Sequence, residues 1–91
     1  MSKEDNFVQA IHNLGSLYRK MGEFDQAEEY LRKGLTLSNQ MKVQVGLYYG
    51  NIEMGYLYRD QGNYEISAQF LENAKQIASD LNNHTFFERD K

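Results

Sequence analysis

Apolar residues recur every three or four positions along the chain, which is the spacing of one face of an α-helix. The pattern breaks after Met21 and again before Tyr64, and no segment alternates with period two. Both breaks contain a glycine, Gly22 and Gly62, as expected where the chain reverses through a positive φ. Asn63 suits a helix N-cap. The pattern therefore predicts four helices, over roughly residues 4–21, 24–40, 43–61 and 64–81.

The second half of the chain repeats the first half with a period of 40 residues. This shift places Gly15 on Gly55, Gly22 on Gly62 and the tripeptide 17–19 on the identical tripeptide 57–59. Gly15 and Gly55 fall in mid-helix, where glycine costs about 0.5–1 kcal/mol relative to alanine. We expect close approach of the second helix of each hairpin to offset that cost, at Ala27 and Ser67.

The repeated unit carries a Leu-Gly or Met-Gly pair, a tyrosine, a turn glycine, an aromatic residue, a small residue, a leucine and a second small residue. In the first copy these are Leu14, Gly15, Tyr18, Gly22, Phe24, Ala27, Leu31 and Gly34. In the second copy they are Met54, Gly55, Tyr58, Gly62, Tyr64, Ser67, Leu71 and Ala74. The unit resembles the tetratricopeptide repeat, whose usual period is about 34 residues. The resemblance implies an all-α fold, a right-handed α-solenoid of two antiparallel helix–turn–helix hairpins.

We expect a single domain over residues 1–91, with repeat one at about 7–41 and repeat two at about 47–81. The repeat register sets Phe7, Leu47 and Phe87 in one column, so residues 82–91 are expected to form a short partial helix or cap. Repeat arrays need a polar element at each end. We therefore expect either self-association at this end or a chain cut from a longer array. The residues expected at this end face are Phe70, Ile77, Phe86 and Phe87.

In the tetratricopeptide repeat family, the first helices of successive units line a concave groove that binds peptides. Carried over by position, the groove residues of the first unit are Gln9, His12, Asn13, Ser16, Arg19 and Lys20. Those of the second unit are Tyr49, Ile52, Glu53, Tyr56, Arg59 and Asp60. Asn13 matches the asparagine that pairs with a peptide backbone amide in this family. His12 and Ser16 replace the Lys and Asn that grip a terminal carboxylate, so a C-terminal carboxylate ligand is not expected.

Several of these side chains have two interpretations. His12 could titrate or bind a metal, but a lone histidine on a mixed helix face is more often a plain surface or hydrogen-bonded residue. Tyr48, Tyr49 and Tyr56 suit either aromatic anchors or a partial core. Arg19 and Arg59 could hold an acidic peptide or close ion pairs within each unit.

Composition excludes several functional classes. The net charge of −3 and the scattered Lys and Arg residues are untypical of a nucleic-acid binder. No apolar run reaches the roughly 20 residues of a membrane-spanning helix. There is no cysteine, the two histidines lie far apart, and no phosphate-binding loop or nucleophile–base pair occurs.

We therefore expect a cytoplasmic protein without enzymatic activity, metal, cofactor, nucleic-acid partner or membrane partner. The first hypothesis is a module that binds a protein or extended peptide in the groove, within a larger scaffold or regulator. The alternative is a structural oligomerisation unit that self-associates through its exposed end faces. The two hypotheses differ in the surface that matters.

Overall fold

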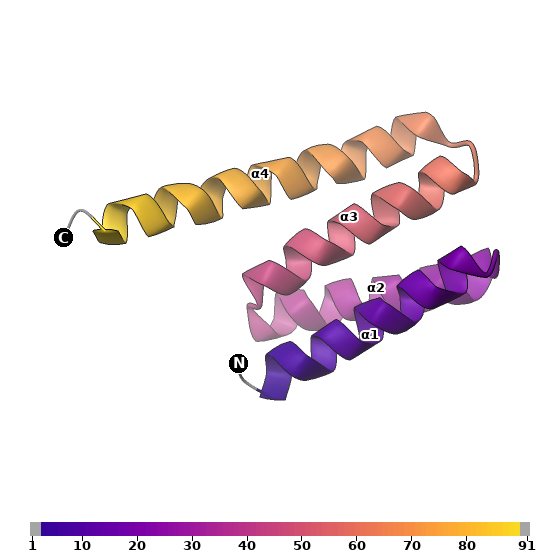
Figure 1. Ribbon diagram of the computed structural model, residues 1–91, viewed down its shortest axis with the longest axis horizontal. Helices are drawn as coiled ribbons and strands as arrows, with labels where there is room; N and C mark the ends of the chain where they lie inside the picture. Colours follow the sequence, from indigo (N-terminus) through magenta and orange to yellow (C-terminus); the bar gives the residue numbers. More distant parts are fainter. Residues whose placement is uncertain (1–2, 90–91) are drawn as a thin grey trace.

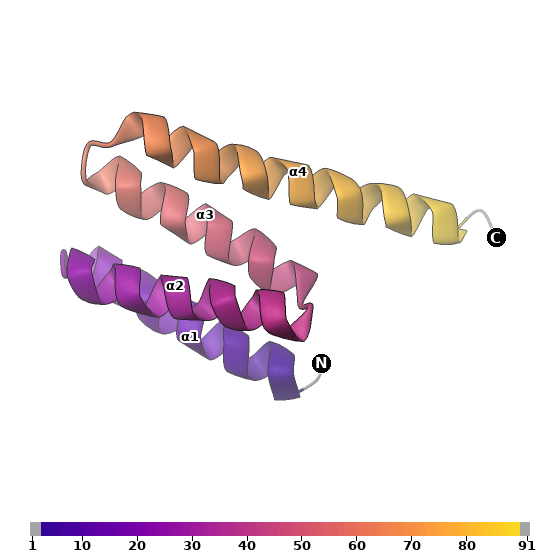
Figure 2. The same ribbon diagram turned by 180° about the vertical axis from the view of Figure 1, so that it is seen from behind.

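The computed structural model describes the backbone of residues 3–89, and the side chains within that range except those of residues 4–5 and 83–89. The chain forms four helices in the order α1 (Lys3–Lys20), α2 (Phe24–Met41), α3 (Gln44–Asp60) and α4 (Tyr64–Arg89). Consecutive helices run antiparallel, and the first pair packs on the second through α2 and α3 (Figures 1 and 2). The predicted all-α class, built from two helical hairpins, is confirmed.

Both turns within the hairpins use the glycines that the sequence predicts. Gly22 has a φ of 79° and Gly62 a φ of 83°, a left-handed conformation that glycine adopts without steric cost. The Ile66 N–H donates to Asn63 Oδ1 over 3.4 Å, which confirms Asn63 as an N-cap. The turn between the hairpins instead places Lys42 in the left-handed region, with a φ of 58°.

The mid-helix glycines permit close packing inside each hairpin; Ser67 approaches Gly55 as expected, but the side chains nearest to the two glycines are leucines. A Cβ atom at Gly15 would lie 2.6 Å from Leu31 Cδ2, and one at Gly55 would lie 2.6 Å from Leu71 Cδ2. The leucine one turn beyond the expected small residue therefore occupies the space that each glycine leaves. Ser67 joins the two helices of the second hairpin by a hydrogen bond, because its hydroxyl donates to the Gly55 carbonyl over 2.7 Å.

The central core joins the two hairpins. Ala27 and Leu31 of α2 and Met54 and Leu57 of α3 are fully buried in one cluster. Stacked rings flank this cluster at equivalent places in the two repeats. Tyr18 stacks on Tyr30 with ring centroids 5.5 Å apart, and Tyr58 stacks on Phe70 at 5.7 Å. The hairpins are therefore held together by buried apolar side chains rather than by turn geometry alone.

The end of the chain differs from the sequence prediction. Residues 82–89 do not begin a separate partial helix; they continue α4, which runs without a break to Arg89. As a result α4 extends well beyond the start of α3 (Figure 1). Over the described residues, no helix combines the length and apolar character needed to cross a membrane.

Candidate binding surface

Helices α1 and α3 lie side by side on one face of the molecule, and charged side chains connect them (Figure 1). Arg19 of α1 pairs with two carboxylates of α3, Asp60 at 2.8 Å and Glu53 at 3.4 Å. We call this surface the α1–α3 face. Its members are Gln9, Asn13, Ser16, Arg19, Lys20, Tyr49, Ile52, Glu53, Tyr56, Arg59 and Asp60.

One end of the α1–α3 face is a closed set of charges around a tyrosine. The Arg19 and Arg59 guanidinium carbons lie 5.4 Å and 4.6 Å from the centre of the Tyr56 ring. Arg59 also pairs with Asp60 at 3.1 Å. The hydrogen bond from Arg19, followed by that from Arg59, lowers the pKa of the Asp60 carboxyl. The interpretation of Arg19 as part of an ion pair within its own unit is wrong, because its partners belong to the other hairpin.

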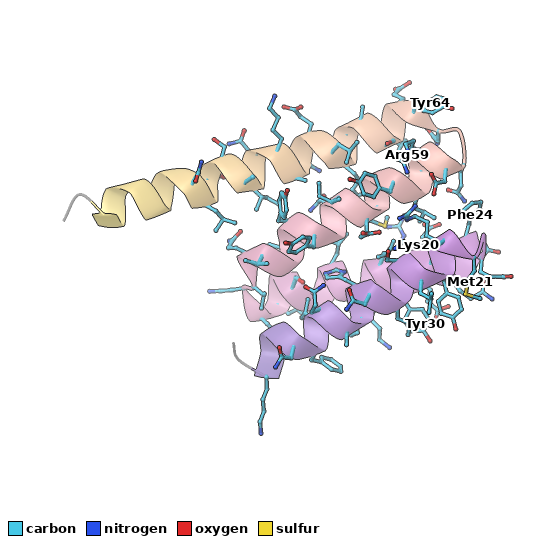
Figure 3. All side chains as sticks on the ribbon, in the orientation of Figure 1. Lys20, Met21, Phe24, Tyr30, Arg59 and Tyr64 are labelled. Atoms are coloured by element: carbon cyan, nitrogen blue, oxygen red, sulfur yellow. The ribbon has the colours of Figure 1, made fainter. Side chains whose placement is uncertain are left out.

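The other end of the α1–α3 face is polar and uncharged. Gln9 Nε2 donates to Asn13 Oδ1 over 3.0 Å, which leaves the Asn13 amide N–H groups without a partner among the described residues. Tyr49 is 45% exposed and meets the edge of Tyr48 at 5.2 Å between ring centroids. Ser16 and Ile52 are half-buried. Exposed Lys20, labelled in Figure 3, belongs to the charged end of the face, because it follows Arg19 at the end of α1. The structure thus brings these predicted residues onto one face.

His12 is not part of that face, so its placement among the groove residues is wrong. Its side chain is only 2% exposed and lies between the helices. A Cβ atom at Gly34 of α2 would lie 2.5 Å from the His12 ring, and one at Gly50 of α3 would lie 2.8 Å from it. Neither ring nitrogen makes a well-aligned hydrogen bond in the described part of the chain, and the backbone of Gly46 is its polar neighbour. The imidazole therefore acts as a packing group at the junction of three helices.

The end-face residues also need a correction. Phe70 does not point away from the molecule, because its ring stacks on Tyr58 of α3 and belongs to the edge of the core. Ile77 is half-buried on α4. The side chains of Phe86 and Phe87 lie outside the described residues.

The burial of His12 predicts that stability falls in mild acid. Burial lowers the pKa of His12 below the ordinary histidine value of about 6.5, while the Gly46 backbone and the Glu53 charge oppose this shift. The unfolded chain then binds the proton more readily than the folded chain. Above about pH 6.5 His12 is neutral in both states and does not lower the free energy of unfolding. As the pH falls from there through the pKa of His12 in the folded chain, the free energy of unfolding decreases by about 1.4 kcal/mol per pH unit.

Urea unfolding at about pH 7.5 and about pH 5 measures this effect. The variant His12→Gln is the control, because it keeps a polar side chain but cannot titrate. We expect a smaller pH dependence in the variant than in the parent chain. Equal pH dependence in both proteins would contradict a buried, neutral His12.

The described residues contain no group of three or more His, Asp or Glu side chains suited to a metal ion. Tandem antiparallel helix pairs with matching glycines and stacked rings instead define a helical-hairpin repeat protein. The sequence profile of the tetratricopeptide repeat matches residues 8–41 and 48–81. The chain belongs to the tetratricopeptide repeat family, whose repeats generally mediate protein–protein interactions and typically act as non-catalytic scaffolds.

A human protein, protein O-mannosyl-transferase TMTC1, is 32% identical to the chain over 68 residues. The match covers 75% of this chain and 7% of that protein. The chain therefore spans only a small part of the length of the relative it matches. No solved structure gives a significant match.

Proposed function

We propose that the chain binds another protein by accepting an extended segment of it along the α1–α3 face. The observation that carries this proposal is the uncharged end of the face, where α3 presents the exposed Tyr49 and α1 presents exposed Asn13, whose amide N–H groups have no partner among the described residues. An amide donor can pair with a peptide carbonyl, and a tyrosine offers a large contact area at low entropic cost. The combination suits a peptide main chain with apolar side chains.

The charged end of the face supports a ligand without strong negative charge. Arg19 and Arg59 are both already paired with carboxylates of α3. An acidic segment would have to displace Asp60 or Glu53 from the two arginines. Each arginine would then exchange one ion pair for another, with little net gain in binding free energy. We therefore propose that these ion pairs fix α1 against α3, and that they do not serve as the anion-binding site of the module.

Selection from a phage-displayed library of random dodecapeptides tests the proposal. We expect enriched peptides that carry apolar residues and little negative charge. The variant Tyr49→Ala should weaken the selected peptide by about 30-fold, as expected for an aromatic anchor worth about 2 kcal/mol. The double variant Tyr49→Ala/Tyr56→Ala should abolish binding, as fluorescence polarisation measures.

Tyr64→Ala is the matched control, because Tyr64 is exposed but lies on α4, away from the α1–α3 face. It should leave the affinity for the peptide unchanged. The proposal fails if no peptide is enriched over a blank surface, or if the control weakens binding as much as Tyr49→Ala does.

A further inference from the structure

The outward side of α1 carries an exposed apolar stripe. Phe7 and Leu17 are each 54% exposed and Met21 is 60% exposed. With exposed Ala10 and half-buried Leu14 they follow spacings of three and four residues, so they form one continuous strip along the helix. Although α1 packs on α2 and α3, the side chains of Phe7, Leu17 and Met21 remain more than half exposed, so no described helix covers them. We call it the α1 stripe.

The middle of the same stripe, at Ala10, Leu14 and Leu17, recurs 40 residues later on α3 and is buried there, whereas Phe7 and Met21 correspond to half-buried Leu47 and exposed Gln61. Leu14 and Leu17 correspond to Met54 and Leu57, which are fully buried. Ala10 corresponds to Gly50, where a Cβ atom would lie 2.5 Å from Leu35 Cδ2 of α2. Helix α2 covers most of these α3 positions, with the His12 ring of α1 also at Gly50, so the α2–α3 interface shows which kind of helix fits the α1 stripe.

Helix α4 is the repeat equivalent of α2, and its corresponding side is uncovered. Three pairs of equivalent positions show this. Leu31 and Ser38 of α2 are fully buried, whereas their counterparts Leu71 and Ala78 are only half-buried. Phe24 is half-buried, whereas its counterpart Tyr64 is 70% exposed. The chain thus presents the two halves of one interface on its two outer helices.

A hollow at the α4 side marks the place that a neighbouring helix would fill. Tyr48, Ala78, Leu81 and Asn82 line an open space of about 220 Å³ between the start of α3 and the extended part of α4. In the first repeat the equivalent space, beside Val8 and Ser38, is closed by Gly46 of α3. The hollow is mostly apolar, so covering it with a helix would remove apolar surface from water.

We infer that copies of this chain associate head to tail, with the α1 stripe of one copy seated on the uncovered side of α4 of the next. The contact would continue the α2–α3 packing from one molecule to the next. Figure 3 shows Met21 and Tyr64 at opposite edges of the same end of the molecule, as such stacking requires.

Charge supports a second copy as the occupant of the α1 stripe. Helix α1 carries three basic and two acidic residues, and α4 carries four acidic and two basic residues, so the two outer helices have formal net charges of opposite sign, with Arg19 of α1 already paired with carboxylates of α3. One substitution weakens the contact relative to α2–α3, because Lys75 of α4 stands where α2 has Leu35. Its aliphatic stem can lie along Ala10 while its ammonium reaches water. We therefore expect reversible association that depends on concentration.

Joining two different surfaces gives an open-ended series of copies rather than a closed dimer. Sedimentation velocity of the unmodified chain, from micromolar to millimolar concentration, should show an average mass that rises beyond that of a dimer. A monomer at every concentration would overturn the inference, and so would a mass that stops at a dimer. This experiment uses only the unmodified chain, so its result does not depend on whether a variant folds.

Two variants, each with one blocked surface, test the pairing directly. Leu17→Glu/Met21→Glu blocks the α1 stripe, and Tyr64→Glu/Ala78→Glu blocks the α4 side; all four positions are exposed or half-buried. Each variant alone should remain monomeric, and an equimolar mixture should form a dimer with one copy of each, because one intact surface of each kind remains. A mixture that stays monomeric, or a single variant that still associates, would overturn head-to-tail pairing.

Discussion

Met54→Ala is expected to lower the free energy of unfolding by about 2–5 kcal/mol, the range for truncating a large buried apolar side chain. Met54 is fully buried and packs in the cluster that contains Ala27 and Leu31 of the other hairpin. Its loss removes transfer free energy and leaves a cavity between the repeats. Urea unfolding followed by far-UV circular dichroism measures the change.

Met41→Ala is the matched control for this substitution. Met41 is the last residue of α2 and is 40% exposed, so its truncation removes little buried surface. We expect a change of less than about 1 kcal/mol. Equal losses in the two variants would mean that Met54 does not occupy the centre of a core shared by the two hairpins.

Gly50→Leu is expected to destabilise the fold by about 1–3 kcal/mol through overpacking, although leucine favours helix more than glycine does. A side chain at Gly50 meets Leu35 from one side and the His12 ring from the other. Leu35 can change rotamer, but the imidazole is enclosed and cannot withdraw without separating α1 from α3. Thermal unfolding at low protein concentration measures the loss.

Ala10→Leu provides the same final side chain at the equivalent position of the first repeat. Ala10 is exposed on α1, so a leucine there has room to extend towards solvent. We expect a change within about 0.5 kcal/mol. If Gly50→Leu were tolerated equally well, the contact between α3 and the His12 ring would not be as close as the structure shows.

The helices and the turns within hairpins could be predicted from the sequence because they depend on local rules. A 3.6-residue period and a glycine that permits positive φ are both visible in the residues themselves. The end of α4 could not be predicted in this way. The turn between α2 and α3 uses Lys42, without glycine, whereas α4 continues through the equivalent Asn82. Among the described residues, no other helix packs over that part of α4 in the way that α3 packs against the end of α2.

The binding surface was only partly predictable for a similar reason. Repeat position correctly places Arg19 and Tyr56 on the face shared by α1 and α3, because this depends on helix phase alone. The burial of His12 depends on Gly34 and Gly50, which come from two other helices. Neither glycine lies in a turn. Glycines in the middle of helices therefore indicate, from the sequence alone, that a bulky side chain fills the space between them. The exposure of Leu17 likewise depends on tertiary structure, because its counterpart Leu57 is buried against α2 whereas no described helix covers Leu17.

Amide chemical-shift mapping by NMR, with the peptide selected from the random library, shows directly which helices contact the peptide. Binding along α1 and α3 predicts that the largest shifts fall on the helical turns around Asn13 and Tyr49, with smaller shifts towards Tyr56. The outer side of α2, including exposed Lys33, should show none. Shifts concentrated on α2 or on the far part of α4, with none on α1 and α3, would contradict the account.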